Sequence, residues 1–185
     1  MIVIISGTNR SDNRSSQVAE LCRRTLETAG EHATVLDLRE LPAALFRPEA
    51  YATRPPEFEP FQRAVLDATG ILTIVPEYNG SFPGVLKLFI DMLRFPESLV
   101  GMPAAFVGVA AGEWGGLRAV EQLELIFQYR HAHLFGRRVF LKNIDTVLST
   151  DGQLTDHTLN ERLGTMVRAF AAFSHAVNGT GNGPK

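Results

Sequence analysis

Three stretches of the 185-residue chain gather residue types that bind small ligands: residues 7–17, 76–84 and 110–118. They are rich in glycine, hydroxyl and amide side chains, with a few charged and aromatic residues among them. The sequence shows neither a readable Ser/His/Asp triad nor a carboxylate pair of the kind that hydrolytic enzymes use. The three stretches therefore indicate a ligand-binding site rather than a side-chain nucleophile.

The first stretch, residues 7–17, has the features of a phosphate site. It leads into a predicted helix, whose first N–H groups and dipole attract an anion. Arg10 could neutralise a dianion through a bidentate contact. The stretch is neither a Walker loop nor the Gly-x-Gly-x-x-Gly of dinucleotide folds. Simple helix capping by its Ser and Asn residues is the alternative. The hydroxyl residues are Thr8, Ser11, Ser15 and Ser16.

The second stretch suits a flat ring, and the third suits a ligand that lies close to the backbone. Tyr78 offers a planar apolar face, and backbone groups of the Asn79-Gly80 turn could bond ring carbonyls and nitrogens. The glycines of residues 110–118 would let a ligand approach the backbone closely. The alternatives are a polar turn that happens to contain a tyrosine and a flexible surface turn. Trp114 could stack on a nicotinamide or serve as a surface anchor.

Strand and helix patterns alternate along the chain, which predicts a parallel sheet with helices on both faces. Both common doubly wound strand orders fit, and the length favours the flavodoxin-like order 2-1-3-4-5 with five strands. Strands are predicted at residues 2–5, 34–38, 71–75, 104–109 and 138–141. Helices are predicted at residues 18–29, 58–69, 85–93, 116–129 and 159–177.

Each of the three stretches follows a predicted strand. Ligands of doubly wound sheets bind beyond the carboxyl ends of the strands, so we expect the three to meet at one edge of the sheet. Gly30, after the first predicted helix, is an expected stop signal. We expect one domain over residues 1–178 and a disordered tail over residues 179–185.

Composition disfavours several classes of protein. The formal charge of −2 lacks the basic excess of a nucleic-acid binder. The single Cys22 falls on an apolar helical stripe, and His131 and His133 lack a third metal ligand. No apolar run approaches ~20 residues, and the first residues lack the basic region of a signal peptide. We therefore expect a cytoplasmic protein without a metal, a nucleic-acid partner or a membrane partner.

Together the three stretches resemble the NADPH-dependent FMN reductase family, which includes flavin, quinone, chromate and azo-dye reductases of flavodoxin-like fold. The family's Gly-Ser/Thr-x-Arg-x-x-Ser is matched by residues 7–10 followed by Ser15 and Ser16. Its Pro-Glu-Tyr-Asn-x-Ser-x-Pro-Gly-x-Leu-Lys is present at residues 76–87, and residues 112–119 resemble its third loop. The spacing from Arg10 to Ser15 is longer than in many members, which leaves the phosphate-binding serine open.

The resemblance implies a noncovalent FMN with its phosphate at residues 7–17 and its ring at residues 76–79. It implies an oxidoreductase that passes hydride from NADPH or NADH to FMN and then to a quinone, flavin, azo or similar acceptor. The flavin carries this chemistry, so no catalytic side chain is expected. Arg14 and Arg118 are candidates for a 2′-phosphate contact. The implied cofactor-binding residues are Gly7, Thr8, Arg10, Ser15, Ser16, Gln17, Pro76, Glu77, Tyr78, Asn79, Gly80, Ala111, Gly112 and Gly115.

Two other functions fit the same fold class. A flavodoxin-like electron carrier would lack a nicotinamide site, and such carriers tend to be strongly acidic, unlike this chain. A flavin-free binding or signalling module of the receiver type would need acids where Ser6 and Gly7 stand.

The predicted helix at residues 85–93 is apolar nearly all round. The Pro-rich segment at residues 41–61 adds apolar side chains without an obvious place in a small core. Symmetric pairing would bury both, so we expect a homodimer or homotetramer built around this helix. The alternative is a monomer whose long loop folds back over the helix.

Overall fold

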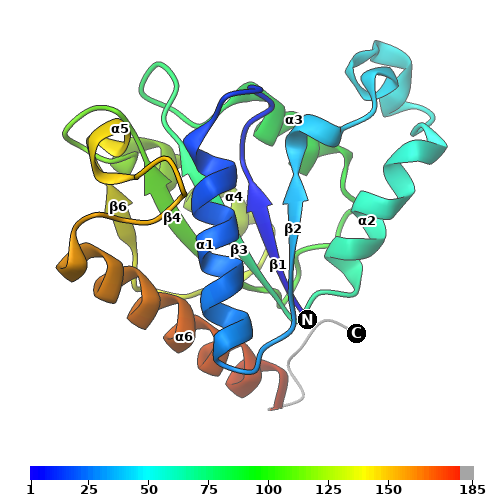
Figure 1. The fold of residues 1–185 in the computed structure, drawn as a ribbon. Coiled ribbons are helices and arrows are strands. Elements are labelled where there is room, and N and C mark those ends of the chain that lie inside the picture. Colours follow the sequence, from blue (N-terminus) through cyan, green and yellow to red (C-terminus); the bar gives the residue numbers. More distant parts are fainter. Residues whose placement is uncertain (180–185) are drawn as a thin grey trace.

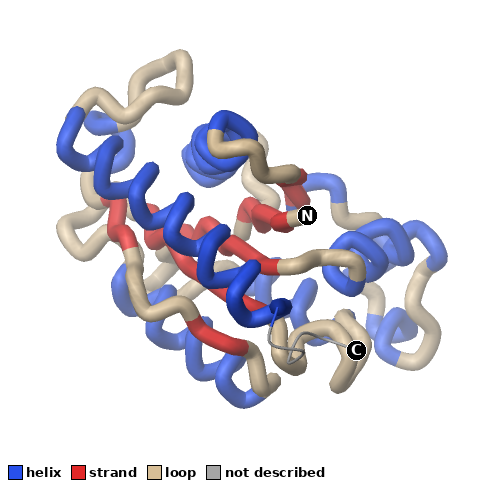
Figure 2. Tube along the Cα trace, turned by 90° about the horizontal axis from the view of Figure 1, so that it is seen from below, coloured by secondary structure: helices blue, strands red, loops and turns tan. Residues whose placement is uncertain are grey.

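The computed structural model describes residues 1–179, which form a parallel sheet with helices on both faces (Figures 1 and 2). The strands are β1 (Ile2–Ser6), β2 (Ala33–Asp37), β3 (Gly70–Pro76), β4 (Pro103–Val109), β5 (His133–Leu134) and β6 (Val139–Leu141). The α-helices are α1 (Arg14–Thr28), α2 (Glu59–Leu66), α3 (Gly84–Met92), α4 (Leu117–Tyr129), α5 (Ile144–Val147) and α6 (His157–Gly179). Short 3-10 turns are η1 (Leu38–Glu40), η2 (Ala43–Phe46), η3 (Pro48–Tyr51) and η4 (Pro56–Phe58).

The strand order is β2-β1-β3-β4-β5, so the predicted flavodoxin-like order is confirmed. The fifth position differs from the prediction of one strand at residues 138–141. Two short strands share it: β5 pairs with the start of β4 and β6 with its end. Between them, Phe135 packs against Phe173 of α6, with ring centroids 5.3 Å apart. The two-residue β5 is too short to leave a periodic signal in the sequence.

The central strands β1, β3 and β4 are buried at every position, as their unbroken apolar runs predict. Alternate residues of β1 enter different cores, because side chains alternate across a strand. Ile2 and Ile4 pack towards α1 and α6, whereas Val3 and Ile5 pack towards α2, α3 and α4. The two cores fix the strand ends from which the loops at the carboxyl edge emerge.

The Pro-rich segment after β2 is ordered and covers α3, contrary to the prediction that this helix lacks cover, whereas Phe46 and Tyr51 of the segment are exposed as predicted. Phe58 of η4 contacts Phe89 of α3 edge-on, with ring centroids 6.0 Å apart. Phe89 and Leu45 are fully buried, and Leu88 is half-buried. The chain's own loop folds back over the helix, so the reason given for an interface at residues 85–93 is wrong.

The ends of α1 and α6 complete the fold. Gly30 follows α1 with φ of +82°, so the predicted helix stop is confirmed. Cys22 is fully buried, and burial raises the pKa of its thiol to about 12, which fits a core residue. Helix α6 extends through Gly179, where the sequence predicts the start of a tail, and residues 180–185 lie outside the described residues.

Within residues 1–179, no helix combines the length and apolar character needed to span a membrane.

Candidate functional site

The first two predicted loops and the start of the third border one cavity of about 890 Å³ at the carboxyl edge of the sheet. In Figure 1 the arrowheads of the central strands point upward to this edge, where the β1–α1 loop and α5 lie. Of the predicted cofactor-binding residues, the cavity is lined by Thr8, Arg10, Ser15, Ser16, Gln17, Pro76, Glu77, Tyr78 and Ala111. Gly7, Asn79, Gly80, Gly112 and Gly115 are not among its lining residues.

Gly7 allows the β1–α1 loop to start against β3. Its N–H donates to the carbonyl oxygen of Ile74 at 3.0 Å. A Cβ atom at this position would lie 2.6 Å from the same oxygen, closer than real contacts allow. Gly7 therefore shapes the cavity through backbone packing, without lining it.

Thr8 and Tyr78 join the first two loops directly. Their hydroxyl oxygens are 2.6 Å apart and share a hydrogen bond, and Thr8 is fully buried. The Arg10 N–H donates to the Thr8 hydroxyl at 3.3 Å, and the Arg10 guanidinium lies 5.9 Å from the centre of the Tyr78 ring. That guanidinium makes no hydrogen bond or ion pair within residues 1–179. It can therefore bind an anion beside the tyrosine.

The N-terminus of α1 presents unpaired donors to the cavity. The Asn13 side chain caps the helix by accepting the Ser16 N–H at 2.7 Å. The N–H groups of Arg14 and Ser15 precede the first intrahelical bond and find no acceptor in the described chain. The Ser15 hydroxyl also lines the cavity and has no hydrogen-bond partner among the described residues.

Ser16 differs from Ser15 because its hydroxyl is already engaged inside the protein. Its oxygen lies 3.1 Å from the Ser6 hydroxyl, and it can donate to Asn13 Oδ1 or Asp37 Oδ2, each at 3.0 Å. The sequence leaves Ser11, Ser15 and Ser16 open as the phosphate-binding serine. All three line the cavity, Ser11 is exposed on the loop, and Ser15 has a freer hydroxyl than Ser16 at the start of α1.

Asp37, at the end of β2, contacts Ser16 at the start of α1 and forms an ion pair with Arg39. Arg39 donates to its Oδ2 from Nη2 at 2.6 Å and from Nε at 2.9 Å. Burial raises the pKa of the Asp37 carboxyl, but hydrogen bonds from Arg39 and Ser16 outweigh burial and hold this pKa below its usual value. The carboxyl group is therefore ionised at neutral pH.

The second loop is a tight turn that fixes Tyr78. Tyr78 and Ser81 exchange backbone hydrogen bonds of 2.7 and 3.1 Å, and both residues between them have positive φ, +53° at Asn79 and +76° at Gly80. These angles confirm the predicted turn. Gln122 of α4 accepts from the Ser81 hydroxyl at 2.6 Å and donates to the Gly80 carbonyl at 3.1 Å. Asn79 and Gly80 thus build the turn that holds Tyr78.

Glu77 carries a buried acceptor without a donor. Its N–H donates to the Val109 carbonyl at 3.1 Å, which extends the pairing of β3 with β4. One of its carboxylate oxygens, Oε2, is buried and has no hydrogen-bond partner in the described part of the chain. Such an atom is costly unless a donor reaches it. A ligand N–H or O–H in the cavity could supply that donor.

The third loop contributes less to the cavity than predicted. Gly116 has φ of +88°, and a Cβ atom there would lie 2.8 Å from the Val109 nitrogen, so the loop packs tightly against the end of β4. Ala110 and Ala111 are its cavity-lining members. Trp114 is exposed, and Arg118 is not a lining residue. Arg14 does line the cavity and forms an ion pair with Asp145 at 3.0 Å.

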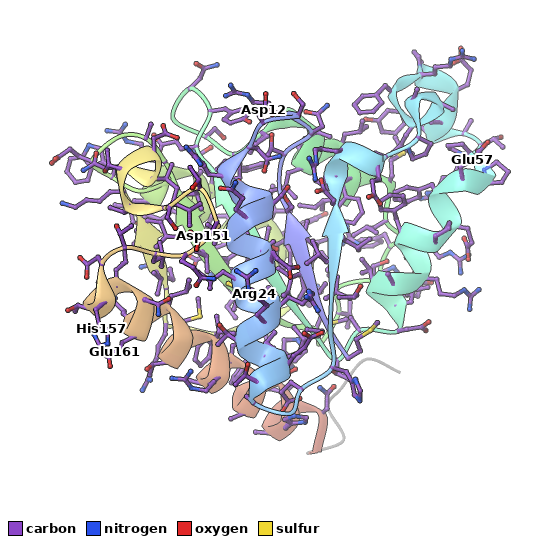
Figure 3. All side chains as sticks on the ribbon, viewed as in Figure 1. Asp12, Arg24, Glu57, Asp151, His157 and Glu161 are labelled. Atoms are coloured by element: carbon purple, nitrogen blue, oxygen red, sulfur yellow. The ribbon has the colours of Figure 1, made fainter. Side chains whose placement is uncertain are left out.

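Sequence reasoning missed lining residues that come from other elements. Arg39 follows β2, Asp145 follows β6, and residues 150–152 form the next turn. Figure 3 labels Asp12 on the β1–α1 loop, Arg24 on α1 and Asp151 beside that helix. The signal that could have found Arg39 and Asp145 is their position just after a strand, at the same sheet edge.

The arrangement can hold an anion at the start of α1 and a flat ring beside Tyr78. The family model for NADPH-dependent FMN reductases matches residues 1–146. An NAD(P)H-dependent FMN reductase of Pseudomonas aeruginosa is 28% identical over 179 residues, 95% of each chain. An NAD(P)H:quinone oxidoreductase of Solanum tuberosum is 29% identical over 86% of this chain and 83% of its own. The flavoenzyme NAD(P)H:(acceptor) oxidoreductase FerB of Paracoccus denitrificans shares the fold, with a TM-score of 0.81, 21% identity, and coverage of 95% and 97%.

Proposed function

Because the chain belongs to the NADPH-dependent FMN reductase family, we propose that its FMN binds in the cavity at the carboxyl edge of the sheet. The protein is an FMN-dependent NAD(P)H oxidoreductase. The phosphate of FMN lies at the β1–α1 loop, and the isoalloxazine ring lies beside Tyr78. This orientation matches each end of the cofactor to the groups that can bind it.

The observation that carries this proposal is the set of unpaired donors at the start of α1. The Arg10 guanidinium, the Ser15 hydroxyl and the first N–H groups of the helix lack acceptors within the described chain. A phosphate dianion supplies the acceptor oxygens and the negative charge that these groups favour. Ser16 is less suited, because its hydroxyl is engaged with Asp37 and Asn13.

The other end of the cavity fits the ring. Tyr78 is fixed by its turn and by Thr8, so it offers a preorganised aromatic side chain. The orphaned Oε2 of Glu77 is an acceptor for the single N–H of the isoalloxazine. We assign Glu77 this contact because it would pair an atom that the protein alone leaves unsatisfied.

When bound, FMN supplies the redox chemistry, taking hydride from NAD(P)H and passing electrons to an acceptor. The protein's part is to bind the cofactor, orient it and leave room beside the ring for a second planar molecule. We propose quinones as the main acceptors, because the Solanum tuberosum relative is a quinone oxidoreductase. Arg14 lines the cavity and is the better placed of the two candidates for a 2′-phosphate contact.

An acceptor panel tests the choice of substrate. The FMN-loaded protein is assayed with NADPH against a benzoquinone, free flavin, an azo dye and a metal oxyanion, and the same mixtures without protein serve as the control. We expect the highest kcat/KM with the quinone. A higher kcat/KM with any of the other acceptors would contradict the proposed acceptor class.

We also propose that the protein acts in the cytoplasm, where NAD(P)H is available, as a homodimer or homotetramer. Support for assembly now comes from large apolar side chains that are exposed on the chain, in place of α3. They include Phe46, Tyr51, Phe95, Trp114, Leu125 and Tyr129. Light scattering at micromolar concentration tests assembly, and a mass of 20.3 kDa, that of one chain, would refute it.

A further inference from the structure

An ion pair beneath the β1–α1 loop has a role that the cofactor contacts leave unexplained. We propose that Asp37 and Arg39 are positioning residues, which hold the β1–α1 loop in the conformation that binds the FMN phosphate. This inference rests on the proposed binding of the phosphate at the start of α1. Neither residue needs to touch the cofactor for the pair to act.

Asp37 gathers hydrogen bonds from two sides of the loop base. It stands at the last position of β2, in register with Ser6 of β1. Its Oδ1 accepts the Arg39 N–H at 3.0 Å, and its Oδ2 accepts the two Arg39 side-chain bonds and the Ser16 hydroxyl. Asp37 is 8% exposed, whereas the Arg39 side chain is 43% exposed, so the carboxylate is the shielded end of this ion pair.

Arg39 extends the contact to the other end of the loop. While Nε and Nη2 bind Asp37, its Nη1 donates to the carbonyl oxygen of Ser11 at 3.2 Å. Two residues at the end of β2 are therefore bonded to the loop: Arg39 to the Ser11 carbonyl oxygen and Asp37 to the Ser16 hydroxyl. The unpaired donors of Arg14 and Ser15 lie between these two anchor points.

The pair also determines which serine hydroxyl is free for a ligand. Both Ser15 and Ser16 line the cavity, but only the Ser16 hydroxyl is bound to side chains of the protein. The Ser16 hydroxyl has one hydrogen to donate, and the ionised Asp37 is the strongest acceptor within its reach. The bond to Asp37 therefore engages the Ser16 hydroxyl and leaves the Ser15 hydroxyl as the free donor of the two.

Charge predicts an asymmetry between the two residues. An ionised carboxylate beneath a phosphate site repels a dianion unless a cation compensates it, and Arg39 is that cation. Replacing Arg39 alone leaves the buried charge of Asp37 uncompensated, whereas replacing Asp37 removes it. We therefore expect Arg39→Gln to weaken FMN binding more than Asp37→Asn does.

The test compares FMN with riboflavin, which has the same ring but no phosphate. Dissociation constants of both flavins are measured by fluorescence titration for the parent protein, Asp37→Asn, Arg39→Gln and Arg39→Lys. Arg138→Gln is the matched control, because Arg138 pairs with Glu124 at 3.1 Å outside this cavity. Thermal unfolding of each variant reports whether it is folded.

We expect the parent to prefer FMN, and Asp37→Asn to lose about tenfold in FMN affinity, as for one charge-assisted hydrogen bond. Arg39→Gln should lose more FMN affinity than Asp37→Asn does, and Arg39→Lys should lose less. The affinity for riboflavin should be unchanged in all variants. Arg138→Gln leaves both affinities as in the parent. If Asp37→Asn does not fold, the FMN and riboflavin affinities of Arg39→Lys are compared with those of the parent instead.

Two results would overturn the positioning role while leaving the phosphate site intact. One is that the Arg39 variants bind both flavins as tightly as the parent, and the other is that they lose affinity equally for both flavins, as a merely structural pair would give. A parent protein that does not prefer FMN to riboflavin would instead overturn the proposed phosphate site, and the positioning role with it.

Discussion

At the residue scale, the Arg10 guanidinium stands out because its charge is unpaired within the described chain and lies beside Tyr78. The cations Arg14 and Arg39 also line the cavity, but they are paired with Asp145 and Asp37. The charge-assisted hydrogen bond of Arg10 should therefore carry a large share of the phosphate affinity.

Arg10→Ala should weaken FMN binding by ~1.5–3 kcal/mol, or roughly ten- to hundredfold, because one charge-assisted hydrogen bond is lost. Fluorescence titration of FMN measures this change. Arg118→Ala is the control, since Arg118 does not line the cavity. An Arg10→Ala variant that held FMN as tightly as the parent would show that the phosphate binds elsewhere.

Asp37 gives a second prediction at this scale, from the pH dependence of stability. Its native pKa lies below the ordinary value of 3.8, so its pairing stabilises the fold above that value and is lost as pH falls through the native pKa. Between about pH 5 and pH 3, the parent should lose more unfolding free energy than Asp37→Asn does. Urea unfolding of the cofactor-free parent and Asp37→Asn at each pH measures these free energies. Parallel pH profiles would contradict the lowered pKa.

At the element scale, the site depends on how closely the β1–α1 loop leaves the sheet. Gly7 sits against the Ile74 carbonyl in β3, and any side chain there must push two neighbouring strand ends apart. The loop and the sheet edge are thus one packed unit, so a change in backbone packing should reach the cofactor.

Gly7→Ala should destabilise the protein by about 1–3 kcal/mol and weaken FMN binding, because overpacking displaces the loop. Gly84→Ala is the matched control: Gly84 is at the start of α3, and a Cβ atom there meets nothing within 4 Å. The control should be neutral or slightly stabilising. Chemical unfolding and FMN titration measure the two effects. Equal behaviour of the two variants would show that the contact at Gly7 can relax freely.

Elements with strong local patterns were predictable from sequence, and those without were not. The buried strands read as unbroken apolar runs, and Gly30 marked the end of α1. The two-residue β5 left no periodic signal, and the cover over α3 comes from 3-10 turns whose contacts are between distant residues. Local sequence cannot show which distant segment covers an apolar face.

The candidate site follows the same rule. Residues of the β1–α1 loop and Tyr78 were predicted because their types and their order after a strand suit a cofactor. Hydrogen bonds join the end of β2 to the loop across more than twenty residues of sequence. They run from Asp37 to Ser16 and from Arg39 to Ser11. No pattern within either segment announces that contact.

At the scale of the whole molecule, the loops that could bind donor and acceptor meet at one cavity. A donor and an acceptor that both need the exposed face of one ring must take turns. The oxidised nicotinamide should therefore leave before the acceptor binds.

This order predicts ping-pong kinetics. Double-reciprocal plots of rate against NADPH concentration, at several fixed quinone concentrations, should give parallel lines. The protein is loaded with FMN and unbound FMN is removed before the assay, because free flavin could itself act as an acceptor. Intersecting lines would indicate that donor and acceptor bind together, and would require two separate approaches to the ring.

The central claim is that bound FMN links NAD(P)H to a quinone in this protein. The most direct test follows the visible flavin absorption of the FMN-loaded protein under nitrogen. We predict that NADPH alone bleaches this absorption and that a quinone, added after removal of the nicotinamide, restores it. A protein that binds no FMN, or whose bound flavin keeps its colour with excess NADPH and NADH, would contradict the claim.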